Sequence, residues 1–242
     1  MNVRGQMWTS PEALRRSHRN VLRAEEPGLT GIGMEPSFGI GQRALLVRTR
    51  DGNVLWDCVP LLDAAVVDGV AAMGGLAAIA ISHPHFYAAM VDWSHAFGRV
   101  PVYVHAADRR HVMRPDRVIE YWDGDHRDLP GGLTLVRCGG HFDGSTLLHW
   151  PEGAKGRGAL LTGDTIQAVP NRRAVSFMYS YPNYIPLPAE AVRRIAEAVE
   201  PLAFDRIYGG WFDRVVPARA KAIVARSAGR YLKAIGSHQA SP

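Results

Sequence analysis

The stretch Ile81-Ser82-His83-Pro84-His85-Phe86-Tyr87-Ala88 decides how the rest of this chain is interpreted. An apolar run over residues 76–81 leads into the histidines and predicts a buried β-strand. In extended backbone, side chains two residues apart lie on the same face, so His83 and His85 can both point to one position just past the strand end. Two imidazoles in this arrangement predict a loop that binds a metal ion.

The composition is that of an ordinary globular protein, with 47% hydrophobic and 21% charged residues in a chain of 242. This length suits one large domain or two small ones, and it is enough for a sizeable core. The formal net charge is +5 and the sequence pI is near 9.5, which favours anionic partners or substrates weakly. No run of five or more like charges occurs, so the charge pattern does not favour a nucleic-acid-binding protein.

The sequence carries no pattern typical of a secreted or membrane protein. Cys58 and Cys138 are far apart and form no Cys-x-x-Cys pair, so we expect buried free thiols in a reducing compartment. The first residues lack the apolar segment of a signal peptide. The longest nearly uncharged apolar stretch, 70–81, is shorter than the roughly 20 residues that span a bilayer. We therefore expect a cytoplasmic protein without a membrane partner.

The chain divides into a short extension and one domain. Ser10-Pro11-Glu12 combines a helix cap, a proline at the first helical position and an acid in the first turn, and predicts a basic helix as far as about Arg23. We assign residues 1–30 to this N-terminal basic helical extension and residues 31–242 to the main domain.

Strand-like and helical runs alternate along the main domain, which is typical of a layered α/β fold. Asp51-Gly52 between two strand-like runs predicts a hairpin. Residues 169–188 form a long loop of the kind that usually carries function. Strands are predicted at 43–49, 54–59, 76–81, 100–105, 133–138, 145–150, 158–163 and 204–208, and helices at 62–73, 88–97, 188–199 and 217–235.

Further side chains stand at strand ends in the same way as the two histidines. Each follows a predicted strand and at least one glycine, a residue that permits a sharp turn and close backbone approach. These side chains are His141, Asp164 and Trp211. Because loops at one end of a rigid scaffold often hold binding residues, we expect them to contribute to one site.

This order of motifs resembles the metallo-β-lactamase superfamily. The elements are an apolar strand with His-x-His, then Gly-Gly-His-x-x-Gly-Ser, then strand-Gly-Asp, and a glycine-rich strand end, spread over residues 40–215. Asp57 is similar to the aspartate that ends an early strand in that family, and we expect it to cap a loop or accept a hydrogen bond from a ligand histidine. The resemblance implies an α/β fold that is a four-layer αββα sandwich, with two mixed β-sheets packed face to face, helices outside, and metals at one edge.

The resemblance also implies a set of metal ligands. His83, His85 and His141 match the family's first three histidine ligands, and Asp164 matches the aspartate that bridges two metals. Three neutral histidines with a water or a carboxylate form the usual arrangement around a catalytic Zn²⁺. Such a site also suits iron, so we expect one divalent ion, with zinc favoured and iron left open.

The second metal site of the family is degenerate in this chain. The full first motif of the family is His-x-His-x-Asp-His, and Tyr87 and Ala88 occupy the positions of its aspartate and its final histidine. The family's last histidine falls at or near Trp211. An alanine coordinates nothing and a tryptophan offers only an N–H donor, so the resemblance implies a mononuclear centre.

These features predict a metal-dependent hydrolase. A metal-bound hydroxide held by the three histidines would attack an ester, thioester or similar bond of a small polar substrate. Asp164 would position or deprotonate the nucleophile, and the hydroxyl of Tyr87 would stabilise the charge that develops.

Residues near the expected site suggest how a substrate would be recognised. Aromatic rings, an amide and a guanidinium suit a small polar or anionic molecule. We predict that the substrate-binding residues are Tyr181, Asn183 and Tyr184 in the long loop, together with Trp211 and Arg214 after the last strand.

Other functions stay open at this point. The same scaffold, with part of its metal site lost, would suit a non-catalytic or ligand-binding protein. An iron-dependent dioxygenase would use a similar His-His-Asp set. A third hypothesis, based on the positive net charge, is a nucleic-acid-binding protein. The sequence does not decide whether the chain assembles into a homo-oligomer.

Overall fold

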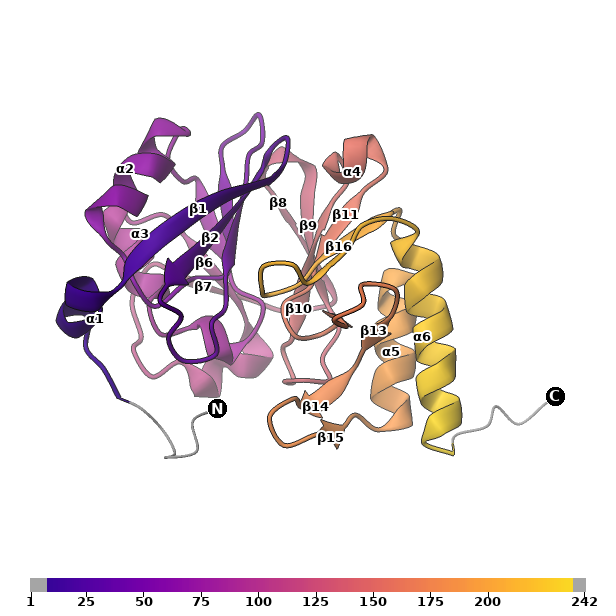
Figure 1. Ribbon diagram of the computed structural model, residues 1–242. Coiled ribbons are helices and arrows are strands. Elements are labelled where there is room, and N and C mark those ends of the chain that lie inside the picture. The colour runs from indigo at the N-terminus through magenta and orange to yellow at the C-terminus, as the bar shows by residue number, and fades with distance from the viewer. Residues whose placement is uncertain (1–7, 237–242) are drawn as a thin grey trace. The chain divides into compact units, whose positions relative to one another are not determined.

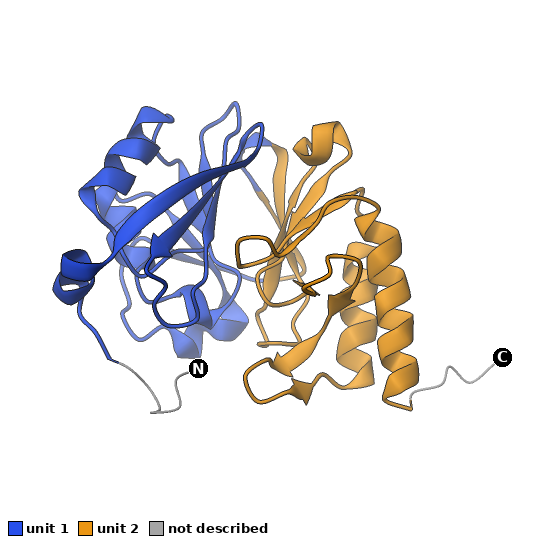
Figure 2. Cartoon of the chain, in the orientation of Figure 1, with its two compact units in different colours: residues 1–123, 129–131 blue, residues 124–128, 132–242 orange. Residues whose placement is uncertain are grey.

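The computed structural model describes residues 8–236, and the chain falls into two compact units (Figures 1 and 2). Unit 1 contains the residues up to Asp123 together with Leu129–Gly131, and unit 2 contains Gly124–Asp128 and the residues from Gly132 onward. Each unit is built on one main β-sheet with helices on it. The boundary between the units lies near residue 123. The division into an extension over 1–30 and a domain over 31–242 stays a prediction.

Unit 1 is built on a seven-stranded mixed sheet in simple chain order. The first four strands pair antiparallel, and the neighbours from the fourth to the seventh pair parallel. Parallel neighbours end at the same sheet edge, so the segments that follow the fourth, fifth and sixth strands begin next to one another. The strands are β1 (Arg19–Glu26), β2 (Leu29–Glu35), β3 (Ala44–Val47), β4 (Val54–Trp56), β5 (Ala78–Ala80), β6 (Val102–His105) and β7 (Ile119–Trp122).

The helices of unit 1 are short, and the apolar core lies between the sheet and two of them. Val66 and Val70 of α2 (Ala64–Ala72) and Trp93 of α3 (Met90–Ala96) pack with the buried side chains of the strands. Asp63 begins α2, because its side chain accepts a hydrogen bond from the N–H of Val66 at 2.8 Å. The remaining helices are α1 (Pro11–Ser17) and the one- or two-turn helices η1 (Pro84–Phe86) and η2 (Ala106–His111).

The predicted N-terminal helix is correct only at its start. Ser10 caps α1 as expected, but the helix ends at Ser17, and residues 19–26 form β1, which pairs with β2. The main-chain N–H of Asn20 donates to the Asp63 carboxylate, and the main-chain N–H of Asp63 donates to the side-chain oxygen of Asn20, which ties β1 to the start of α2. Exposed arginines occur on edge strands as well as on helix faces. The basic residues alone therefore do not distinguish a strand from a helix, and the helix prediction was wrong after Ser17. The part of the predicted extension over residues 1–7 lies outside the described residues.

Unit 2 is built on a six-stranded mixed sheet of order β17-β16-β11-β10-β9-β8. Strands β11 and β16 pair parallel, and the pairs β9–β10, β10–β11 and β16–β17 are antiparallel. The strands are β8 (His126–Leu129), β9 (Leu133–Arg137), β10 (Thr146–Trp150), β11 (Ala159–Leu161), β16 (Arg206–Tyr208) and β17 (Val215–Val216). Two short helical turns connect them, η3 (Pro130–Gly132) and α4 (Gly153–Gly156).

Two long helices, α5 (Ala189–Val199) and α6 (Ala220–Ala234), lie side by side over the sheet of unit 2 (Figure 1). Buried residues of α5 recur at Val192, Ile195 and Val199, the spacing of one helical face. They pack with β-strand side chains such as Leu147 and Leu160 in the core of this unit. The sequence pattern predicted both helices.

The predicted loop 169–188 is more ordered than expected. It contains most of two short hairpins, in which β12 (Gln167–Ala168) pairs with β13 (Val175–Ser176) and β14 (Met178–Ser180) pairs with β15 (Ile185–Pro186). Their pairs are too short to show a two-residue alternation that a sequence pattern could reveal.

Two glycines beside β11 give a matched test of close backbone approach. Gly158 has φ +83°, and a Cβ there would overlap the carbonyl oxygen of Ala203, whereas Gly156 has φ +79° and open space around the same position. We expect Gly156→Ala to cost about 1 kcal/mol for the left-handed backbone, and Gly158→Ala to cost roughly 1–3 kcal/mol more for the clash. Urea unfolding of both variants measures the difference, and equal costs would contradict this packing.

Candidate metal centre

His83 and His85 form a pair at the carboxyl end of β5. His83 is 1% exposed and extended, whereas His85 is exposed and lies within η1, whose first residue is Pro84. The Nε2 atom of His83 lies 3.1 Å from Nδ1 of His85, and the ring of Phe86 packs edge-on against the His83 imidazole. The predicted pairing is therefore confirmed, but a helical turn brings the rings together rather than the alternation of a strand.

His141 stands in a tight loop after β9. Gly139 and Gly140 have φ of +64° and +89°, which lets the chain turn sharply, and the N–H groups of Cys138 and Gly139 both donate to the carbonyl of Ser145. The ring of His141 is 4% exposed, and its Nδ1 lies 3.0 Å from the carbonyl oxygen of Met178. A carbonyl only accepts hydrogen bonds, so Nδ1 carries the proton and Nε2 of the neutral ring keeps its lone pair.

Asp164 lies in the turn that follows β11, and its side chain faces His141. It is 3% exposed, and its Oδ2 lies 3.6 Å from Nε2 of His141. The turn is held by Thr162, whose hydroxyl donates to the carbonyl of Ile166 at 2.6 Å. The hydroxyl of Tyr181 donates to the main-chain carbonyl of Asp164 at 3.1 Å, with the carbonyl of Ser176 at 3.2 Å.

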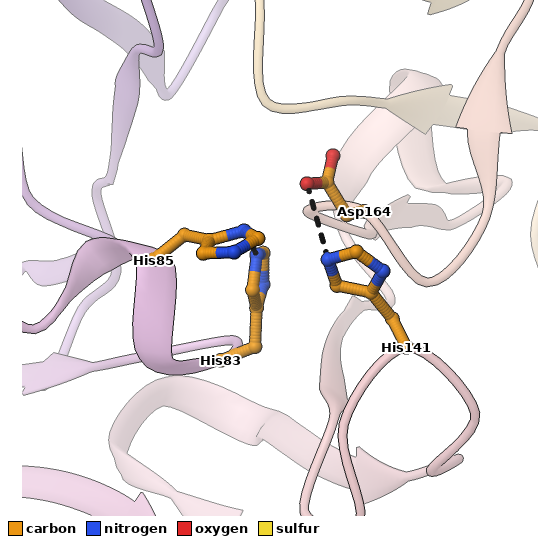
Figure 3. Close-up of side chains that lie close together, drawn as sticks. All are labelled: His83, His85, His141 and Asp164. Atoms are coloured by element: carbon orange, nitrogen blue, oxygen red, sulfur yellow. Dashed lines mark hydrogen bonds and ion pairs between the residues drawn. The ribbon is translucent and has the colours of Figure 1, made fainter. Parts of the chain in front are cut away.

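Among residues 8–236, these side chains are the His, Cys, Asp or Glu group that could hold a metal ion. Each of His83, His85, His141 and Asp164 offers one ligand atom, and these atoms lie within 4.8 Å of one another (Figure 3). Two atoms that are 3.1 Å or 3.6 Å apart, each about 2.0–2.1 Å from one Zn²⁺, subtend about 100° and 120° at the ion. These angles bracket the tetrahedral value, so these two pairs of donor atoms have the spacing that one zinc ion requires.

Tyr87, a predicted catalytic residue, is 9% exposed and belongs to the apolar core of unit 1. Burial raises the pKa of its phenol, and the negative charges of Asp108 and Asp57 raise it further. The hydroxyl therefore stays protonated in neutral solution, so it would act in a reaction as a hydrogen-bond donor and not as a base. Its part in a reaction stays a prediction.

The predicted substrate-binding residues differ in their exposure. Tyr181 is half-buried and supports the backbone of Asp164 and Ser176, whereas Asn183 is exposed and donates to the hydroxyl of Ser180, and Tyr184 is 85% exposed with φ +55°. Trp211 and Arg214 are half-buried in the turn between β16 and β17, which a hydrogen bond from the N–H of Arg214 to the carbonyl of Trp211 closes. Contact of these residues with a substrate stays a prediction.

Sequence reasoning missed two groups that hold the histidines. The carbonyl of Met178 orients His141, and a main-chain group leaves no signal in a sequence. The hydroxyl of Ser82 lies 2.8 Å from Nδ1 of His83. A serine directly before a ligand histidine is the signal that could have revealed it.

The two cysteines take no part in this cluster. Both are free and buried, and burial raises the pKa of Cys138 from 9.0 to about 12, although the guanidinium of Arg194 lowers it. An unfolded chain ionises this thiol near pH 9, whereas the folded chain keeps it protonated. The stability that this difference provides is therefore complete below pH 9 and is lost as the pH rises toward 12. We expect urea unfolding to show this decline, and the slope to be smaller in Cys138→Ala; an equal slope would contradict the assignment.

In the described part of the chain, no helix is both long enough and apolar enough to cross a membrane.

No protein-family model matches the sequence. The chain is 47% identical over 235 residues to YmaE of Bacillus subtilis (strain 168), an uncharacterized protein, and the alignment covers 96% of this chain and 85% of YmaE.

Solved structures of metallo-β-lactamases are similar to this chain. VMB-1 superposes with a TM-score of 0.66 at 13% identity, covering 89% of this chain and 98% of VMB-1. DIM-1, from a crystal exposed to ceftazidime, gives 0.64 at 13% identity, with 89% and 97% covered. A HARLDQ-motif mutant of the Cronobacter sakazakii enzyme gives 0.57 at 20% identity, with 91% and 99% covered.

At these identities the likeness establishes the fold. The expected αββα class is confirmed, because the two mixed sheets with their helices match the metallo-β-lactamase sandwich. The resemblance inferred from the motifs is confirmed by the same structures and by the histidine–aspartate cluster. The chain therefore belongs to the family of Bacillus subtilis YmaE and has the fold of the metallo-β-lactamases.

Proposed function

We propose that this protein is a mononuclear metal-dependent hydrolase that cleaves an ester, thioester or similar bond of a small polar substrate. The observation that carries the proposal is the cluster of three histidines and one aspartate on a metallo-β-lactamase fold. His83, His85, His141 and Asp164 would each supply one ligand atom. Zinc suits this donor set best, and iron is the alternative.

The number of ions follows from the positions that lack a ligand. Tyr87 and Ala88 stand where the family's second metal would need a carboxylate and an imidazole, and the indole of Trp211 has no lone pair to donate. The hydroxyl of Tyr87 also stays protonated, because burial raises its pKa. We therefore propose one ion and assign Tyr87 to hydrogen bonding rather than to coordination.

The residues of the cluster have distinct roles in the proposed reaction. When bound, the ion would lower the pKa of a water molecule to roughly 7 and so supply hydroxide near neutral pH. Asp164 would bind the ion through Oδ2, the oxygen that faces His141, and its other carboxylate oxygen would orient this nucleophile and accept its proton. The phenol of Tyr87 would donate a hydrogen bond to the oxygen on which negative charge develops.

Groups around the cluster would recognise the substrate. We assign Arg214 to an anionic group, Trp211 to a wall of the binding site, and Asn183 with Tyr184 to polar and aromatic contacts. Tyr181 is proposed to contact the substrate through its ring, and its hydroxyl supports the backbone of Asp164. The net charge of +5 is consistent with an anionic substrate.

Metal content and hydrolysis test the proposal together. Protein purified without chelator should contain one ion per chain by mass spectrometry, and it should hydrolyse members of a panel of chromogenic esters and thioesters. Dialysis against a chelator should abolish this activity, and Zn²⁺ should restore it. Absence of stoichiometric metal would favour a non-catalytic protein on the same scaffold. Iron with oxygen uptake on a thiol substrate would favour a dioxygenase.

A further inference from the structure

Asp57, Ser82 and His83 form a continuous chain of hydrogen bonds inside unit 1. The main-chain N–H of Ser82 donates to Oδ1 of Asp57 at 2.8 Å, and its hydroxyl lies 3.0 Å from Oδ2 of the same carboxylate. The serine hydroxyl also lies 2.8 Å from Nδ1 of His83. All three residues are 1% exposed, so water does not compete for these hydrogen bonds.

The chemistry of these groups fixes the direction of the chain. A carboxylate accepts hydrogen bonds and has no proton to give, whereas a serine hydroxyl has one proton to donate. Ser82 therefore gives its proton to Asp57, and its oxygen can only accept from the ring of His83. This requires a proton on Nδ1 of His83 and leaves the lone pair of the neutral ring on Nε2, the atom that lies 3.1 Å from His85.

We propose that Asp57, acting through Ser82, is the positioning residue that sets the tautomer of His83, so that Nε2 is available to a metal ion. The inference deepens the proposed function and rests on it where it concerns the metal. His141 needs no such side-chain relay, because the carbonyl of Met178 sets its tautomer directly. Of these two buried histidines, only His83 has a tautomer that side-chain substitutions at Asp57 and Ser82 can reverse.

The backbone conformation and a hydrogen bond of Asp57 fix the position of its carboxylate between the ends of two strands. Asp57 has φ +64°, a left-handed conformation that costs most side chains free energy and that Asp and Asn tolerate best. Its N–H donates to the carbonyl of Ala80 at 2.9 Å, which joins the ends of β4 and β5. The end of β4 thus holds the acceptor, and the end of β5 carries the serine and the histidine.

The substitution Asp57→Asn tests the direction of the chain with little change in shape. The N–H of Ser82 would hold the amide oxygen of the new side chain, so its NH₂ group would face the Ser82 hydroxyl. That hydroxyl would then donate to Nδ1 of His83 and move the ring proton to Nε2. We expect the ¹⁵N shifts of the His83 imidazole in metal-free protein to report this exchange, while those of His141 stay unchanged.

Metal affinity gives a second readout. We expect Asp57→Asn to weaken Zn²⁺ binding by about 10- to 100-fold in a chelator competition, because this is the usual effect of losing a hydrogen-bond partner of a metal ligand. Ser82→Ala breaks the relay, so the double variant Asp57→Asn/Ser82→Ala should bind zinc no more weakly than Ser82→Ala alone. Ser82→Thr keeps a hydroxyl and should restore affinity. Circular dichroism and thermal unfolding verify that each variant folds.

The outcomes separate this inference from the proposed function. A proton that stays on Nδ1 of His83 in Asp57→Asn, or additive effects in the double variant, would overturn the relay. If the wild-type protein binds no zinc but the imidazole shifts exchange as expected, the relay stands and the proposed metal centre fails. If zinc binds with one ion per chain and the shifts do not exchange, the metal centre stands and the relay fails.

Discussion

Replacing His83, His85 or His141 with alanine is expected to weaken zinc binding by more than about 100-fold. Loss of a group that only hydrogen-bonds to a metal ligand usually costs about 10- to 100-fold. Each substitution removes one neutral imidazole lone pair, and the remaining three donors cannot complete a four-coordinate site from the protein. The loss should be similar for all three histidines, because one ion would need each of them. Competition with a chromophoric chelator measures the affinity.

A matched substitution of an exposed histidine controls for general effects. His126→Ala removes an imidazole from β8, and we expect it to leave zinc affinity within about two-fold, as for a surface change away from the site. Retention of full affinity in His141→Ala would remove His141 from the metal centre. Loss of affinity in His126→Ala would show that the competition reports unfolding or surface binding instead.

Asp164→Asn is expected to reduce kcat for ester or thioester hydrolysis by about 10²- to 10⁴-fold, the usual contribution of a positioned general base. The amide keeps the shape and one oxygen of the carboxylate, so the variant should fold and retain a metal ion. It cannot accept a proton near neutral pH, so the rate should become dependent on added small bases. Steady-state kinetics with and without imidazole buffer measure this.

The control for Asp164 is an exposed carboxylate in the same unit. Asp128 accepts a hydrogen bond from the hydroxyl of Thr134 at 3.1 Å, and we expect Asp128→Asn to leave kcat unchanged. Wild-type turnover in Asp164→Asn would exclude this aspartate as the base. A loss of metal in the same variant would instead assign Asp164 to coordination alone.

The sequence alone predicted those elements of the fold whose burial pattern is local. Residues 188–199 carry an apolar stripe at helical spacing, and the structure places α5 there. Residues 133–138 and 145–150 are apolar runs between glycine-rich turns, and they form β9 and β10. These patterns depend on one element facing one core, which a short window of sequence contains.

Strands that depend on their partners were not predicted. The sequence of β1 predicts a basic helix. In the structure it is a strand, because the turn at residues 27–28 brings it against β2, with Arg19 opposite Glu35. β7 and β8 were missed as well, since β7 is fixed by parallel pairing with β6 and β8 lies at an edge of its sheet. Pairing between distant segments has no signature within either segment alone.

The candidate site divides in the same way. The sequence alone identified the candidate metal ligands, because the residue types and the order of His83, His85, His141 and Asp164 match those of the family. It also showed that Tyr87 stands where a further ligand would be needed. Only the tertiary structure decided which ring nitrogen each buried histidine offers, since this depends on the carbonyl of Met178 and on the Asp57–Ser82 pair. Ligand identity is a property of single residues, whereas the position of a proton is set by neighbours that folding brings within 3 Å or so.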